Sequence, residues 1–186
     1  MKKQSIRAHL NEYSIYQKRA TTINHAFASA IAENDAYNEA KLDKALRALG
    51  QEPDEDLSCF YCDENAETWD HIYGLVKKYE YSGYGHVIGN LIPCCKKCNS
   101  EKGNQNWQSF LNKKISNPKK KKAKITALQN YLSAFLQESC GYKKIKEICK
   151  AEVCEYEAVK KKIIENMKKA DKIAEVIRKR IKKQKA

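Results

Sequence analysis

Four of the eight cysteines form two Cys-x-x-Cys pairs, Cys59 with Cys62 and Cys95 with Cys98. Each pair makes a turn that puts both sulfurs on one side of the backbone, and four thiolates complete the ligand set of a tetrahedral structural zinc. Cys94 is an alternative to Cys95, but only Cys95 keeps the two-residue spacing to Cys98. We therefore expect one structural Zn²⁺ on Cys59, Cys62, Cys95 and Cys98, with Cys94 as a small buried residue.

Four polar residues, Asp70, His71, Asn90 and Asn99, lie in the same short stretch. Because four thiolates leave no open position on zinc, any chemistry must come from such side chains. Residues 69–76 and 89–95 are strand-like, and the capping residues after Cys98 indicate a helix start. Since successive strand side chains point to opposite faces, Asp70 and His71 converge only at a bulge or a strand end.

Residues 59–104, which are 46 of the 186 residues, resemble an HNH endonuclease of the ββα-metal class with a four-cysteine zinc. The residues that match the family motif in order and spacing are Asp70, His71, Ile72, Asn90, Leu91, Pro93, Cys95, Cys98, Asn99, Lys102 and Gly103. His71 is the first letter of the motif and Asn90 the second. Asn99 stands where the third letter is often His, and it keeps a side-chain oxygen for a metal.

The resemblance implies hydrolysis of DNA phosphodiester bonds that leaves 5′-phosphate and 3′-hydroxyl ends. This reaction needs a base for the attacking water and a cation to offset charge on the phosphoryl oxygens. Neutral His71 suits the first task at pH 7. Asp70 and Asn99 carry the oxygen ligands that a catalytic Mg²⁺ or Mn²⁺ prefers. Asn90 is expected to orient the His71 loop by hydrogen bonds.

Two further residues of this stretch are candidates for contact with DNA. Lys102 is expected to meet a phosphate, although a solvated surface lysine is the alternative. His86 follows Gly83 and Gly85, which predict a turn between the two strands where a loop could approach the DNA backbone closely. For His86 a substrate contact and a plain loop residue are equally favoured.

Each of these residues also has a plainer interpretation. His71 alone would be a structural histidine, and Asn90 or Asn99 alone would be a turn or cap residue. Together, inside a zinc frame, they favour a nuclease. The alternatives are a non-catalytic zinc-ribbon protein that binds nucleic acid and a helical assembly protein. Both of these functions would survive loss of His71.

The N-terminal residues 4–50 have the pattern of two helices. Apolar residues recur at helical spacing from Ile15 to Ile31, and a second helix is expected from near Ala36 to Leu49, with Gly50 as its stop. Residues 51–58 contain Pro53 and four acidic side chains, which is typical of a linker. We expect this arm to be a scaffold.

Positive charge is concentrated in the C-terminal part of the chain. Residues 113–186 contain 23 Lys and Arg against 8 Asp and Glu, whereas residues 1–112 contain 13 against 15. Lys119, Lys120, Lys121 and Lys122 follow Pro118 in what reads as a solvent loop that lies along phosphates. This segregation favours DNA as the partner.

A helix is expected from Leu128 to near Gly141, and one or two helices follow from Tyr142. Eleven mostly apolar residues between Ile145 and Ile181 recur with a mean spacing of 3.6, which indicates an amphipathic helix and not a strict coiled-coil seam. This stripe is also a candidate surface for a homodimer. Cys140, Cys149 and Cys154 lack Cys-x-x-Cys pairing and are expected to be buried thiols.

The expected architecture is α+β and mostly helical, with a zinc-stapled ββα unit flanked by helices. The ranges are 1–52 for the N-terminal helical arm, 53–112 for the HNH domain and 113–186 for the basic helical region. No signal peptide and no membrane span are visible in the sequence, so reduced thiols in the cytoplasm are expected. The expected role is a bacterial or phage restriction or defence nuclease.

Overall fold

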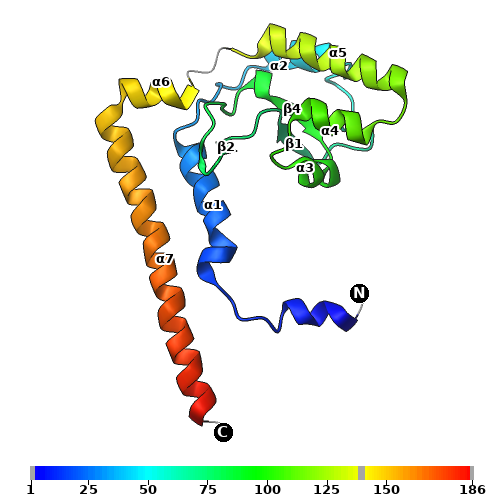
Figure 1. The fold of residues 1–186 in the computed structure, drawn as a ribbon. Helices are drawn as coiled ribbons and strands as arrows, with labels where there is room; N and C mark the ends of the chain where they lie inside the picture. The colour runs from blue at the N-terminus through cyan, green and yellow to red at the C-terminus, as the bar shows by residue number, and fades with distance from the viewer. Residues whose placement is uncertain (1–2, 138–140, 185–186) are drawn as a thin grey trace. The chain divides into compact units, whose positions relative to one another are not determined.

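The computed structural model describes residues 3–137 and 141–184, most of them in helices. The chain divides into two compact units (Figure 1). The central unit is Ala28–Ile145, and the terminal unit combines the chain up to Phe27 with the chain from Lys146. In the described part of the chain, no helix is both long and apolar enough to cross a membrane.

Two antiparallel strands, β1 (Thr68–His71) and β4 (Leu91–Cys94), form a small sheet in the central unit (Figure 1). The register pairs Asp70 with Ile92 and His71 with Leu91. Helix α3 (Lys96–Lys102) begins directly after Cys95, whose sulfur caps it by accepting a hydrogen bond from the backbone N–H of Cys98. Strand, strand and helix therefore follow one another in the order that the sequence predicts.

The strand expected at residues 69–76 is shorter in the structure, because β1 ends at His71. Val76 belongs to a separate hairpin. This hairpin consists of β2 (Val76–Lys77) and β3 (Glu80–Tyr81), and it turns at Lys78 and Tyr79, both with positive φ. Two residues with positive φ between paired strands are the geometry of a tight β-hairpin. The glycines at 83 and 85, predicted to form the turn, lie after the hairpin.

Gly85 instead allows two stretches of backbone to approach each other. A Cβ atom at this position would lie 2.1 Å from the carbonyl oxygen of Glu33. The next residue, His86, donates its backbone N–H to the same oxygen at 2.7 Å and forms a parallel bridge with Asn34. We expected the loop at Gly85 to approach a DNA backbone closely, and in the structure it approaches the backbone of Glu33.

Four further elements surround the small sheet (Figure 1): α2 (Glu39–Ala48), the 3₁₀ helix η2 (Ile88–Asn90), α4 (Trp107–Lys114) and α5 (Pro118–Phe135). Gly50 has φ +74°, as expected for the residue that ends α2. The core joins these elements to the sheet and the cysteines, through side chains that include Leu49, Phe60, Ile92, Leu111 and Leu128.

The run from Lys119 to Lys122 is helical, so the prediction of a solvent loop is wrong. Asn117 accepts a hydrogen bond from the backbone N–H of Lys120, and Pro118 occupies the first turn of α5. An Asn cap followed by Pro is a favourable helix start, because Pro loses no hydrogen bond there. The lysines from Lys119 to Lys122 therefore project from the N-terminal end of α5.

The terminal unit pairs α1 (Ile15–Ala30) with the 35-residue α7 (Lys150–Gln184). The Asp171 carboxylate accepts hydrogen bonds from Ser14 Oγ and from the backbone N–H groups of Ile15 and Tyr16. Tyr156 donates its hydroxyl to the Phe27 carbonyl. The remaining elements of the chain are the 3₁₀ helix η1 (Lys3–Ala8) and α6 (Gly141–Ile148).

Helices occupy the C-terminal region as predicted, but the expectation of buried thiols there needs correction. None of the described residues of α7 is fully buried, so its apolar stripe is only partly covered. Cys154 is exposed and Cys149 is half-buried, because they do not lie in a closed core. Cys140 lies outside the described residues. The boundaries of the two units differ from those of the three expected ranges. Helices α2 and α5 both pack against the core that contains the cysteines.

Candidate functional site

The four cysteines of the two Cys-x-x-Cys pairs come together in one cluster. Their sulfurs all lie within 4.8 Å of one another, and those of Cys62 and Cys95 are 3.7 Å apart. Sulfurs about 2.3 Å from a central tetrahedral zinc would lie roughly 3.8 Å apart. Cys59, Cys95 and Cys98 are buried, which suits a structural metal. The cluster is compatible with one structural zinc ion.

Cys94 is fully buried and lies beside this cluster. Its sulfur is 3.9 Å from that of Cys59 and 3.3 Å from the carbonyl oxygen of Cys95. The interaction with the neighbouring Cys94 side chain lowers the pKa of Cys59 to about 4, which favours the thiolate that a metal requires. Cys94 thus supports a ligand from outside the four-sulfur group.

Asp70 faces the interior, away from the exposed side of β1. Its carboxylate accepts hydrogen bonds from the Tyr61 hydroxyl at 2.8 Å and from Lys102 Nζ at 3.1 and 3.3 Å. Burial raises the pKa of Asp70, and the neighbouring ammonium of Lys102 opposes this rise. With both oxygens engaged and the side chain 5% exposed, the expected role as a Mg²⁺ or Mn²⁺ ligand has no support in this geometry.

Lys102 lies in the last turn of α3, and its side chain is only 1% exposed. Besides Asp70, its ammonium donates to the backbone carbonyl of His71 at 2.7 Å. A phosphate contact was expected from the sequence, but such a contact requires a solvent-facing ammonium. In the structure Lys102 instead ties α3 to the end of β1 that carries His71.

His71 lies on the opposite side of β1 from Asp70 and contacts a second histidine. His71 Nε2 and His86 Nδ1 are 3.0 Å apart, and their rings meet edge to face with centroids 5.0 Å apart. Sequence analysis did not anticipate this pairing. The available signal was a pair of histidines on either side of a hairpin, at residues 71 and 86.

Asn90 fastens the two histidine-bearing segments to each other. Its buried side chain accepts a hydrogen bond from the backbone N–H of Tyr73 at 2.9 Å and donates to the carbonyls of Tyr73 and Gly85, both at 3.0 Å. Tyr73 follows His71 by two residues, and Gly85 directly precedes His86. The hydrogen bonds expected between Asn90 and the His71 loop are therefore present.

Asn99 connects α3 to β1 through its side-chain amide, which donates to the Trp69 carbonyl at 3.4 Å. Among the described residues, the four cysteines are the one group of three or more His, Cys, Asp or Glu ligands close enough to share a metal ion. Of the two residues expected to hold Mg²⁺ or Mn²⁺, Asp70 is already engaged by Tyr61 and Lys102. We therefore assign no catalytic cation site.

The lysines at the start of α5 lie beside the loop that contains Cys62 and Asp63. Lys120 and Lys124 both pair with Asp63, which directly follows Cys62. Lys119 and Lys122 line a shallow surface hollow, and Lys121 is exposed. Among the described residues, no acidic side chain pairs with Lys119, Lys121 or Lys122, whereas Lys120 shares Asp63 with Lys124.

The site thus consists of a ββα frame, a four-cysteine cluster at its base and a histidine pair held by a buried asparagine. Comparison with protein-family models, with curated proteins and with solved structures finds no match for this chain.

Proposed function

We propose that this protein is an endonuclease of the HNH type that hydrolyses DNA phosphodiester bonds, with His71 as general base. The observation that carries the proposal is the His71–His86 pair, locked to a ββα frame by Asn90. A general base must be held in a fixed orientation beside the scissile bond. His86 contacts the His71 ring directly, and Asn90, at the end of η2, joins the backbone at Tyr73 to that at Gly85.

In this reaction His71 accepts a proton from the attacking water. A neutral imidazole is suited to that task near pH 7. The contact with His86 holds the orientation of the His71 ring, because its Nε2 is engaged there. Lys102 holds the His71 backbone through its carbonyl, so the ion pair with Asp70 positions the base from the interior.

The four-cysteine cluster would bind one zinc ion, which would join the segment before β1 to the start of α3. Because all four ligands would come from the protein, this metal would have a structural role. The basic residues 113–186 would attract DNA, since their 23 cationic side chains outnumber the 8 acidic ones and complement a polyanion.

Incubation of purified protein with supercoiled plasmid tests the proposal directly. Parallel reactions contain Mg²⁺, Mn²⁺ or EDTA, and the ends are mapped by sequencing. We expect nicked or linear DNA with 5′-phosphates in at least one metal condition, and none with His71→Ala. Intact plasmid in every condition, or equal cleavage by the His71→Ala protein, would contradict the assignment.

A second candidate function is a non-catalytic zinc-ribbon protein that binds nucleic acid. It is favoured by one observation, namely that the described residues present no ready site for a catalytic cation. This candidate expects salt-sensitive DNA binding that is unchanged by His71→Ala, and no cleavage by either protein.

A further inference from the structure

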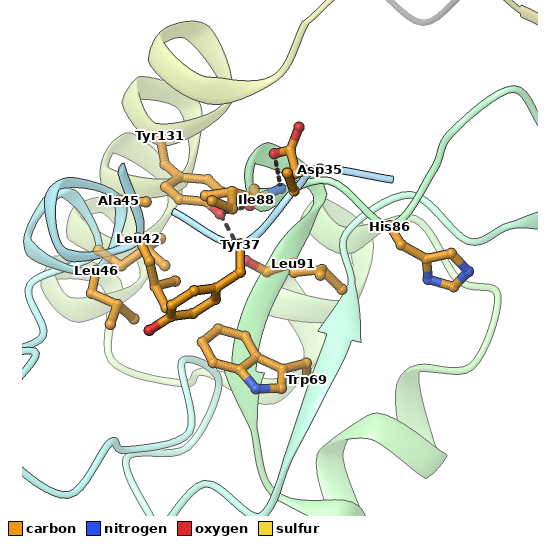
Figure 2. A pocket seen from close by; sticks show the side chains of 12 residues that line it. Asp35, Tyr37, Leu42, Ala45, Leu46, Trp69, His86, Ile88, Leu91 and Tyr131 are labelled. Atoms are coloured by element: carbon orange, nitrogen blue, oxygen red, sulfur yellow. Dashed lines mark hydrogen bonds between the residues drawn. The ribbon is translucent and has the colours of Figure 1, made fainter. Parts of the chain in front are cut away.

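A cavity of about 300 Å³ opens beside the histidine pair. Its walls come from α2, α5 and the exposed face of the sheet, through side chains that include Leu42, Leu46, Trp69 and Tyr131. Figure 2 shows Tyr37 and Trp69 among these residues, with the ring of His86 turned away from the cavity. His86 therefore borders the cavity while its Nδ1 contacts His71.

The cavity lies on the same face of β1 as the proposed base. Trp69 and His71 are two positions apart in one strand, so their side chains point to the same side, about 7 Å apart along the chain. Their partners in β4 are Pro93 and Leu91, and Leu91 also lines the cavity. The cavity and the proposed catalytic histidine thus share one continuous surface.

Two of the polar side chains that line the cavity, Tyr131 and Asp35, are hydrogen-bonded within the protein. The Tyr131 hydroxyl donates to the carbonyls of Leu91 and Ile88. The Asp35 carboxylate accepts from the Ile88 N–H at 2.9 Å and from Lys41 Nζ at 2.9 Å. Most of the other lining residues are aliphatic or aromatic, and such a surface binds the flat faces of rings.

Two aromatic side chains at the cavity are unusually exposed. Trp69 is 40% and Tyr37 is 80% exposed, although both line the cavity. A volume near the lower limit for ligand pockets has room for one ring system and is too small for a peptide helix. Exposed aromatic rings beside a phosphate-handling site are the usual platform for stacking nucleobases.

We propose that this cavity binds one unpaired nucleobase of the substrate strand, stacked against Trp69, next to the phosphate presented to His71. The inference rests on the proposed nuclease function and specifies its substrate. A base paired in a duplex cannot enter such a cavity without leaving the stack, which costs energy that an unpaired base has already lost. The protein therefore prefers DNA with bulged, mismatched or single-stranded bases.

Binding by the full-length His71→Ala protein tests this preference without cleavage. Fluorescence anisotropy is measured with labelled duplexes that contain one bulged base, an abasic bulge at the same position, or no bulge. We expect the bulged base to bind most tightly. Because stacking on an aromatic side chain is worth roughly 5- to 150-fold in affinity, adding Trp69→Ala should weaken binding of the bulged base by that factor. It should leave the abasic and fully paired duplexes nearly unchanged.

Two further variants make the result specific to the cavity. Leu42→Trp fills the cavity from the half-buried face of α2 and should abolish the preference for the bulged base without removing any group. Tyr79→Ala removes a 77% exposed ring from the β2–β3 turn, which does not line the cavity, and should not change binding. Equal affinity for the bulged and abasic duplexes, or an equal loss with Tyr79→Ala, would overturn the base-binding cavity.

Plasmid cleavage by the unmodified protein is measured in parallel, so the two proposals fail separately. A Trp69-dependent preference without cleavage would support the cavity and remove the nuclease. Cleavage without any preference for unpaired bases would do the reverse.

Discussion

Asp70 and Lys102 form an ion pair in which both side chains are almost fully buried. Burial of one charge without the other is costly, so we expect Lys102→Met to lower the free energy of unfolding by about 3–5 kcal/mol. Lys102→Met combined with Asp70→Asn should recover part of this loss, because no buried charge is left unpaired. Urea denaturation of the three proteins measures the difference. An unchanged midpoint for Lys102→Met would mean that Lys102 faces solvent.

His71 and His86 should differ in the size of their effects on cleavage. His71→Ala removes the base and should lower turnover by about 10² to 10⁴, while DNA affinity is kept. His86→Ala leaves the base but not its orientation, so kcat should fall less and KM should change little. His86→Gln, which keeps a hydrogen-bonding group, should restore part of the rate. Steady-state kinetics on a labelled oligonucleotide separate kcat from KM, and a His86→Ala effect on KM alone would indicate a substrate contact instead.

Residue types and spacing predicted the cysteine cluster and the contacts of Asn90, but not the side to which each side chain points. The cysteine cluster and the hydrogen bonds of Asn90 follow from a motif that is local in sequence. The engagement of Asp70 by Lys102 depends on how α3 lies across β1, which is a tertiary feature. The role of His86 could not be predicted from the sequence, because its location is set by a backbone bridge to Asn34, in a distant segment.

The zinc cluster joins the loop before β1 to the start of α3, so metal and fold should be lost together. We expect about one zinc per chain by elemental analysis, and Cys98→Ser should lose the metal and much of the local folding energy. Cys94→Ala is the matched control, since Cys94 lies outside the four-sulfur group. It should retain zinc. Retention of zinc by Cys95→Ser through Cys94 would correct the ligand set.

Helix α1 is capped by a residue from a distant helix, Asp171 of α7. Hydrogen bonds from the backbone of Tyr16 and Ile15 lower the pKa of Asp171, so this cap stabilises the terminal unit above the ordinary pKa of aspartate. Its contribution should be lost as the pH falls through the lowered pKa. We expect Asp171→Ala to increase proteolysis of residues 14–30 at neutral pH, and to remove the acid-dependent part of this sensitivity. Asp171→Asn keeps a capping group and should be milder.

Helices with clear apolar spacing were predictable from sequence, whereas the start of α5 was not. The spacing from Ile15 to Ile31 gave α1, and Gly50 marked the end of α2. Helix α5 was predicted from Leu128 onward only, because Pro118 and four lysines resemble a loop until Asn117 is recognised as a cap. The strand predicted at residues 69–76 was too long, since β1 ends at His71 and only Val76 belongs to the hairpin that follows.

Across the whole chain, the strong segregation of charge predicts salt-dependent DNA binding. Each lysine that neutralises a phosphate releases counterions, so its removal should reduce the log–log salt slope by about one unit. The structure distinguishes the four lysines at the start of α5, because Lys120 is paired with Asp63 and Lys121 is exposed. Lys121→Gln should therefore flatten the salt slope more than Lys120→Gln, although both substitutions remove the same charge from adjacent residues.

Anisotropy titrations from low to moderate salt, with the His71→Ala protein to prevent cleavage, measure these slopes. Replacing Lys119, Lys121 and Lys122 together should lower the slope by up to about three units, with turnover at saturating DNA largely kept in the otherwise unmodified protein. These lysines project from the first turns of α5 beside the zinc loop, and none of them contacts His71 or His86 in the hydrogen bonds described. If the slope is unchanged, the start of α5 is a solvated helix end, and DNA must be held by the cationic residues of other elements.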